Sequence, residues 1–206
     1  MNSMLPRRDF LLRTTAFALF GSFLGSGAFA QAAERASAFV KTTGEQLVAV
    51  VNGGGSAEAK RRELSRIIEG AVDIDGVGRF CLGRFWRQAS PEQQKRYLDV
   101  FRQVLVTSIS TKLGEYQGVR FTVGRSQQRD DNQVVSTVVE RPNNAPAAVD
   151  WVISHPASKP QIVDVIAEGT SLRITQRSDY AAYLQRNNNS IDALISAMRD
   201  QVAQNS

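Results

Sequence analysis

Few residues in this chain could form a catalytic or metal site. Its only histidine, His155, stands beside Pro156, and its only cysteine is Cys81. A zinc site normally needs three or four His, Cys or carboxylate ligands, so these two residues alone are too few to form one. We expect His155 to be a solvated turn residue and Cys81 to be a small buried apolar side chain. The sequence also has no nucleophile elbow, phosphate loop or dinucleotide fingerprint.

One acid–base arrangement remains open. Asp164 with Tyr97 or Tyr116 could act as a general base and a hydrogen-bond donor, as in small isomerases and dehydratases with cone-shaped folds. An Asp164 that faces solvent or pairs with an arginine would exclude this arrangement. Glu168 has no recognisable catalytic partner, and with Gly169 it is typical of a turn. We therefore expect no enzyme activity, no cofactor and no metal.

Two sequence blocks are the most informative part of the chain for recognising a protein family. Residues 72–93 read V-D-I-D-G-V-G-R-F-C-L-G-R-F-W-R-Q-A-S-P-E-Q, and residues 164–172 read D-V-I-A-E-G-T-S-L, followed by Q-R-S-D-Y at 176–180. In composition, order and separation they resemble the MlaC family, also called Ttg2-type toluene-tolerance proteins. These are periplasmic carriers that ferry lipid between the two membranes of Gram-negative bacteria. The resemblance covers most of residues 35–203.

The resemblance implies a fold, a ligand and partners. It implies an α+β fold with a curved antiparallel sheet of about four strands against a long helix, similar to a nuclear-transport-factor-like cone, with extra helices at both ends. The ligand would be a phospholipid or, in a related branch, a hopanoid. The partners would be an inner-membrane ABC transporter complex with a substrate-binding ring and an outer-membrane lipoprotein/porin complex. We expect a monomer that binds no nucleic acid.

The first 30 residues predict an export signal. Arg7-Arg8 followed by Asp9-Phe10-Leu11 gives a twin-arginine pattern, although Pro6 and Leu12 depart from it. A mildly apolar run over 14–27 ends in the small-x-small sequence of residues 28–30. We expect cleavage after Ala30 and a periplasmic location; an ordinary secretory signal or a single membrane anchor is the alternative.

The remaining residues, 31–206, are long enough for one domain with a sizeable core. The formal net charge of the chain is +5, of which the signal segment holds +2, so the mature protein carries about +3. This charge allows weak attraction to acidic partners or lipid headgroups. The basic residues are scattered, which does not favour nucleic-acid binding.

Hydrophobic periodicity gives the order of elements. It predicts helices over 35–51, 57–69 and 74–82, and a long helix that starts with the capping box of residues 90–93 and ends at Gly118. The period then changes to two over 119–123, 133–141, 147–154 and 161–167, which predicts strands. Helices over 178–186 and 191–202 close the chain. Helices, then an antiparallel meander, then helices indicate an α+β fold.

The sequence favours a carrier because acyl chains need an apolar cavity and no nucleophile. We expect the cavity between one sheet face and the central helices. Its predicted lining is Phe80, Leu82, Phe85, Trp86, Phe101, Leu105, Ile109, Val149, Trp151, Ile153, Val163 and Val165. A closed core has the same pattern, so a structural envelope module with a filled core is the alternative. Arg79, Arg84 and Arg87 would either rim the mouth of the cavity or have a structural role, by pairing with Asp73, Asp75 or Asp164 or by stacking on Trp86. We favour the structural role for Arg84.

Overall fold

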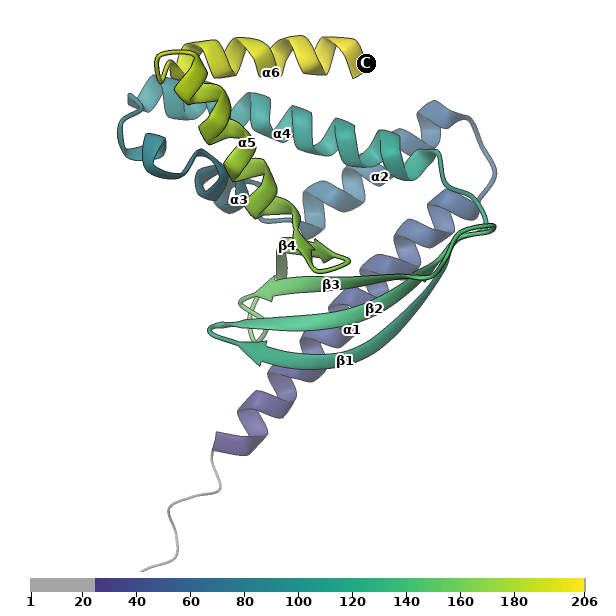
Figure 1. Ribbon diagram of the computed structural model, residues 1–206. Coiled ribbons are helices and arrows are strands. Elements are labelled where there is room, and N and C mark those ends of the chain that lie inside the picture. Colours follow the sequence, from purple (N-terminus) through teal and green to yellow (C-terminus); the bar gives the residue numbers. More distant parts are fainter. Residues whose placement is uncertain (1–24, 206) are drawn as a thin grey trace, which may run out of the picture.

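The computed structural model describes residues 25–205, which form six α-helices, one short 3-10 helix and five strands (Figure 1). In chain order they are α1 (Gly25–Asn52), α2 (Ala57–Ala71), α3 (Ile74–Leu82), η1 (Gly83–Arg87), α4 (Pro91–Gly114), β1 (Arg120–Arg129), β2 (Asn132–Glu140), β3 (Ala147–Ser154), β4 (Gln161–Ala167), β5 (Thr170–Ser171), α5 (Leu172–Arg186) and α6 (Ile191–Asn205).

The strands form one antiparallel sheet in the order β1-β2-β3-β4-β5, and its long strands curve (Figure 1). The predicted α+β class is therefore confirmed, and β3 and β4 have the predicted bounds. Two features were missed. The short β5 is a fifth strand, and β1 continues to Arg129 instead of ending near Val123. Its second half, G-R-S-Q-Q-R, is polar on both faces, so it carries no alternating apolar signal.

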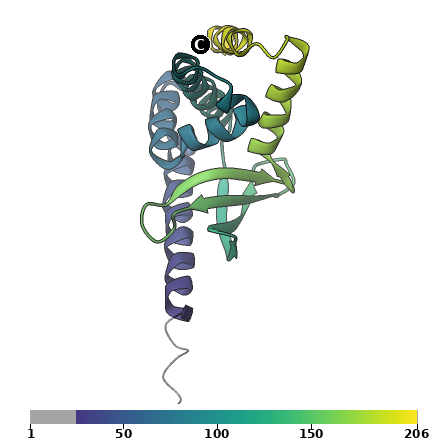
Figure 2. The ribbon, with the colours of Figure 1, turned by 90° about the vertical axis from the view of Figure 1, so that its left-hand side faces the viewer.

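Two apolar clusters hold the fold together. The larger lies among the helices and includes Leu64, Tyr97, Phe101, Leu184 and Ile195. The smaller lies between α1 and the sheet. It contains Ala36, Val40, Ala71, Val135, Ile153 and Ile162. The long helix that covers the sheet is therefore α1, which runs beside the sheet in both views (Figures 1 and 2), whereas we expected the later helix α4 in that place.

The caps of α3 and α4 explain where these helices begin. The Ser90 hydroxyl accepts a hydrogen bond from the Gln93 amide nitrogen, and the Gln93 side chain accepts one from the Ser90 amide, so the predicted capping box is confirmed. Asp73 caps α3 by accepting from the Gly76 amide. These two caps define where α3 and α4 begin, and residues 83–89 connect the end of α3 to the start of α4.

Gly44 allows α1 to approach the sheet closely. A Cβ atom at this position would lie 2.4 Å from Cε1 of Phe121 on β1. We expect Gly44→Ala to lower the free energy of unfolding by about 1–3 kcal/mol, because overpacking outweighs the better helix propensity of alanine. Urea denaturation would measure this. The matched control is Gly70→Ala in α2, where a Cβ meets nothing within 4 Å; a Gly44→Ala protein as stable as this control would contradict the prediction.

Most of the predicted export signal lies outside the described residues. Its last part, residues 25–30, belongs to α1, which runs without interruption to Asn52. Across residues 25–205, none of the helices combines the length and the apolar character that a bilayer crossing requires.

Candidate functional site

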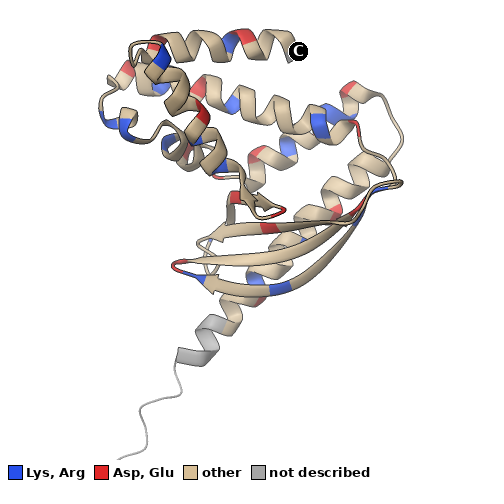
Figure 3. Cartoon of the chain, in the orientation of Figure 1, with Lys and Arg blue, Asp and Glu red and all other residues tan. Residues whose placement is uncertain are grey.

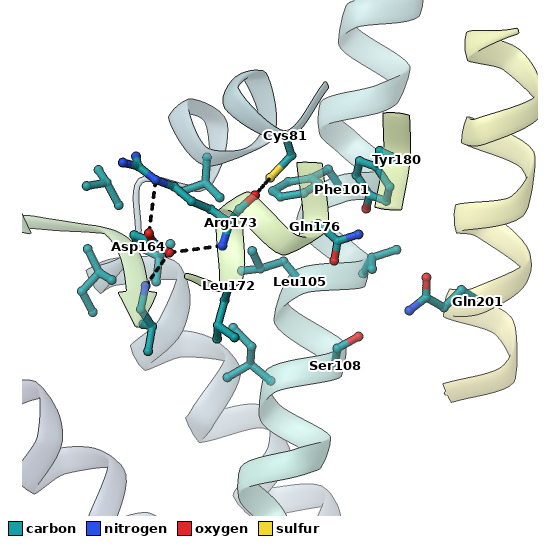
Figure 4. Close-up of a pocket in the computed structure, with 17 residues that line it drawn as sticks. Cys81, Phe101, Leu105, Ser108, Asp164, Leu172, Arg173, Gln176, Tyr180 and Gln201 are labelled. Atoms are coloured by element: carbon teal, nitrogen blue, oxygen red, sulfur yellow. Dashed lines mark hydrogen bonds and ion pairs between the residues drawn. The ribbon is translucent and has the colours of Figure 1, made fainter. Parts of the chain in front are cut away.

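A cavity of about 220 Å³ lies between α3, α4, α5 and β4 (Figure 4). The side chains around it are mostly apolar. They come from Val72, Val77, Cys81, Phe101, Val104, Leu105, Ser108, Ile109, Ile162, Val163, Asp164, Val165, Leu172, Arg173, Gln176, Tyr180 and Gln201. Such walls provide few hydrogen-bonding groups, so the cavity suits a hydrocarbon ligand better than a polar one.

An irregular strand forms the sheet wall of this cavity. The β3–β4 ladder passes from the pair Val152–Asp164 to the pair Ile153–Ile162, so Val163 is an extra residue without a partner in β3. In a regular strand alternate side chains point to opposite faces, but here residues 162–165 all line the cavity. The bulge therefore lets four consecutive residues of β4 border the same cavity.

Asp164 joins this strand to the start of α5. Its Oδ1 accepts from the backbone amides of Val165 (2.8 Å) and Arg173 (3.1 Å), and the Ser171 hydroxyl donates to its Oδ2 over 2.6 Å. The Arg173 Nε lies 3.4 Å from Oδ2, and the Asp164 side chain is only 4% exposed. The carboxylate is thus fully engaged in holding β4, β5 and α5 together (Figure 4).

This network determines whether the predicted acid–base pair can act in catalysis. Asp164 is paired with Arg173, which is the arrangement that excludes a free general base. The Tyr97 hydroxyl donates to the Gly78 carbonyl oxygen at 2.9 Å, and Tyr116 lies under the guanidinium of Arg141. Among residues 25–205, no group of three or more His, Cys, Asp or Glu side chains is arranged to hold a metal ion. His155 is exposed in the turn after β3, as expected.

A second, smaller cavity of about 90 Å³ lies between α1, α4 and the sheet. It is bounded by Gly44, Leu47, Val48, Val51, Leu113, Tyr116, Val119, Phe121, Val139 and Trp151. Ile109 of the first cavity and Leu113 of the second are one helical turn apart on α4, and Val165 of the first pairs with Trp151 of the second across the β3–β4 ladder. The two cavities therefore lie next to each other, on the same side of α4.

Six of the twelve predicted lining residues border a cavity. Phe101, Leu105, Ile109, Val163 and Val165 line the larger one, and Trp151 lines the smaller one. The other six, Phe80, Leu82, Phe85, Trp86, Val149 and Ile153, lie outside both linings. Leu82 and Phe85 are buried in the helical cluster, and Ile153 is fully buried against α1. Sequence periodicity places these residues on the apolar faces of their elements, but it does not distinguish a face that packs against another element from one that lines a cavity.

Phe80 and Trp86 are stacked with arginines. The guanidinium groups of Arg173 and Arg177 both stack on the Phe80 ring, at 4.4 and 5.0 Å from its centroid. Arg79 lies over Trp86 at 5.5 Å. Arg84 stacks on Phe85 in the same way, at 4.9 Å. Arg79 therefore stacks on Trp86, as one of the structural alternatives predicted, whereas the ring under Arg84 is Phe85 and not Trp86. Figure 3 shows charged residues of both signs over the helical part of the molecule and few on the face of the sheet.

The sequence analysis missed the contribution of α5. This helix was predicted from residue 178, yet it begins at Leu172 and provides Leu172, Gln176 and Tyr180 to the cavity. These residues are spaced by four and share one face. Ser171, whose hydroxyl accepts from the Ile174 amide, is an N-cap that could have marked the earlier start.

The cavity environment of Cys81 makes its thiol unreactive. Burial raises the pKa of Cys81 to about 12, and the thiol contacts the Arg173 carbonyl oxygen over 3.6 Å. We expect a chromogenic disulfide reagent at pH 8 to react with Cys81 at least 100-fold more slowly in the native protein than in denaturant. Rapid labelling of the native protein would show that this wall of the cavity opens freely.

Comparisons with known proteins are consistent with this geometry. The MlaC protein family matches residues 41–200. The toluene tolerance protein ttg2D of Pseudomonas putida is 28% identical over 142 residues, a match that spans 68% of this chain and 66% of that protein. The structure of the phospholipid-binding protein from Ralstonia solanacearum in complex with a phospholipid aligns with a TM-score of 0.72, covering 82% of this chain and 98% of that one, at 22% identity. The similarity to the Ralstonia solanacearum structure shows a shared fold.

Proposed function

This chain belongs to the MlaC protein family, and we propose that it is a periplasmic lipid carrier that holds the acyl chains of a phospholipid between α4, α5 and β4. One observation carries the proposal. The two sequence blocks that resemble the family lie about 70 residues apart in the chain, yet both contribute to the same apolar cavity. Val77 and Cys81 come from the first block, and Val165, Leu172 and Tyr180 come from the second.

The energetics suit a carrier. Each methylene removed from water contributes about 0.8 kcal/mol, so two long acyl chains gain roughly 20 kcal/mol or more. A bilayer offers about the same amount. A cavity that is as apolar as the bilayer interior can therefore accept a lipid with little net change in free energy, and a docking partner can shift the balance in either direction.

The size of the cavity implies that the loaded protein is wider. Sites for small ligands usually enclose about 300–1,000 Å³, and the larger cavity encloses about 220 Å³. We propose that loading joins it to the neighbouring 90 Å³ cavity past Ile109 and Leu113. The exposed side chain of Leu172, 52% accessible at the start of α5, places apolar surface where an entering chain would first make contact.

The family and its relatives support a role for this protein in a transport system of the cell envelope. We propose that the protein is exported, has no enzymatic activity and moves lipid between an inner-membrane ABC transporter complex with a substrate-binding ring and an outer-membrane lipoprotein/porin complex. The engaged state of Asp164 supports a binding role over catalysis, since the carboxylate has no free oxygen to accept a substrate proton.

Native mass spectrometry of the full chain purified from its own cell envelope tests the proposal. We expect one bound lipid whose released mass and fragments identify a phospholipid. A rigid polycyclic lipid such as a hopanoid in its place would confirm a lipid carrier and correct its cargo. A reproducibly empty protein that also takes up no lipid from phospholipid vesicles would contradict the proposal.

A further inference from the structure

The hydroxyl of Tyr180 is a buried donor without a partner. Tyr180 is 6% exposed, and its hydroxyl oxygen makes no hydrogen bond to any described residue. Its ring is held in place by edge contacts to Tyr97 and Phe101, at centroid distances of 6.3 and 6.4 Å. Leaving such a group unpaired is unfavourable, because it has lost its bonds to water and gained none. A ligand with an oxygen acceptor beside Tyr180 would satisfy this hydroxyl.

Tyr180 lies where two hollows meet. It lines the apolar cavity, and it also lines a groove of about 410 Å³ between α5 and α6. Gln176 and Gln201 border both hollows as well, and Figure 4 shows them on the side of the cavity away from Asp164 and β4. The groove beyond them has a mixed lining, with the charged side chains Asp179 and Arg186 beside apolar ones such as Leu194 and Met198.

The cavity is therefore polar at one end and apolar at the other. Toward β4 its walls are aliphatic, from residues such as Ile109, Val163 and Val165, and the one carboxylate there is saturated by its own partners. Toward α6 it offers the Tyr180 hydroxyl and two side-chain amides. Burial raises the pKa of Tyr180, so the hydroxyl stays protonated and acts as a donor at neutral pH. Its natural partner is an uncharged or anionic oxygen acceptor.

We propose that Tyr180 donates a hydrogen bond to an ester carbonyl oxygen of the bound lipid, so that the acyl chains extend toward β4 and the glycerol and headgroup occupy the groove between α5 and α6. This inference rests on the proposed function, because it assigns the orientation of the ligand in the same site. An ester carbonyl fits the position since it is the acceptor at the boundary between the apolar and the polar part of a glycerolipid. Gln176 and Gln201 offer further donors and acceptors for the glycerol region.

The test removes each partner of the hydrogen bond separately. The full chain and its Tyr180→Phe variant are each titrated with two phospholipids of the same headgroup and chain length, one with ester and one with ether linkages. We expect the wild-type protein to bind the ester lipid about five- to tenfold more tightly than the ether lipid, the usual range for one neutral hydrogen bond. Tyr180→Phe should lose this preference by weakening ester binding alone.

Two further measurements keep the outcome clear. Tyr180→Phe removes an unpaired hydroxyl, so the midpoint of urea unfolding of the empty protein should stay the same or rise. The matched control Tyr97→Phe removes a hydroxyl that already binds the Gly78 carbonyl oxygen; it should lower the unfolding midpoint and keep the ester preference. If the wild-type protein binds ester and ether lipids equally, or if Tyr180→Phe weakens both alike, the inference fails while the carrier function stands. If neither lipid binds, the proposed function itself fails.

Discussion

Replacing Leu105 by aspartate is expected to reduce lipid affinity at least 100-fold while the protein stays folded. Leu105 is half-buried on α4, and its side chain is part of the cavity wall (Figure 4). In the empty protein, water that enters the cavity can solvate a carboxylate there. A bound acyl chain would exclude that water and leave the charge unpaired, which costs several kcal/mol, and each 1.4 kcal/mol is a factor of ten in affinity.

A titration with a fluorescent-chain phospholipid would measure this effect. The control is Gln103→Asp, which introduces the same charge on an exposed position of the same helix and should leave affinity within about twofold. Circular dichroism and urea unfolding of both variants check the fold. If Leu105→Asp binds lipid as tightly as Gln103→Asp, the acyl chains do not lie between α4 and β4.

Removing the carboxylate of Asp164 is expected to have the largest effect on stability. The side chain accepts from two backbone amides and the Ser171 hydroxyl and pairs with Arg173, and these contacts fix α5 to β4. Asp164→Ala would leave a largely buried guanidinium without its carboxylate, and the amides of Val165 and Arg173 without this acceptor. Breaking a buried ion pair from one side costs about 3–5 kcal/mol, so we expect a loss of about that size in the free energy of unfolding.

Urea denaturation followed by tryptophan fluorescence would measure the loss. The comparison is Asp75→Ala, which breaks the ion pair with Arg102 at a site where the two side chains are 47% and 44% exposed. Such exposed pairs contribute at most about 1 kcal/mol. Similar losses in the two variants would show that the Asp164 network does not fix α5.

Much of the fold could be predicted from sequence because its signals are local. The capping box at Ser90 and the alternation in β3 and β4 each depend on a few neighbouring residues, and the elements they predict are present. The polar half of β1 could not be predicted in the same way. Residues 126–129 pair with β2 after a register shift between Val123 and Ser126, and the side chains of 124–129 carry no apolar pattern.

The site was harder to predict because its lining depends on non-local geometry. The bulge at Val163 brings consecutive residues of β4 to the border of the cavity, and only the pairing with β3 reveals it. Trp151 and Ile153 share a predicted face with Val149, yet α1 covers that face, and the cavity forms beside it at β4, next to the short edge strand β5. Tyr180 is a different case. The unpaired state of its buried hydroxyl appears only in three dimensions.

The most direct test of the carrier account is a crystal structure of the loaded protein with a phospholipid whose acyl chains carry bromine atoms. The account predicts bromine anomalous density inside the protein, within van der Waals contact of Leu105 and Val163, and a cavity wider than the present 220 Å³. Bromine density confined to the outer surface, with Leu105 and Val163 in their present positions and the cavity unchanged, would contradict it.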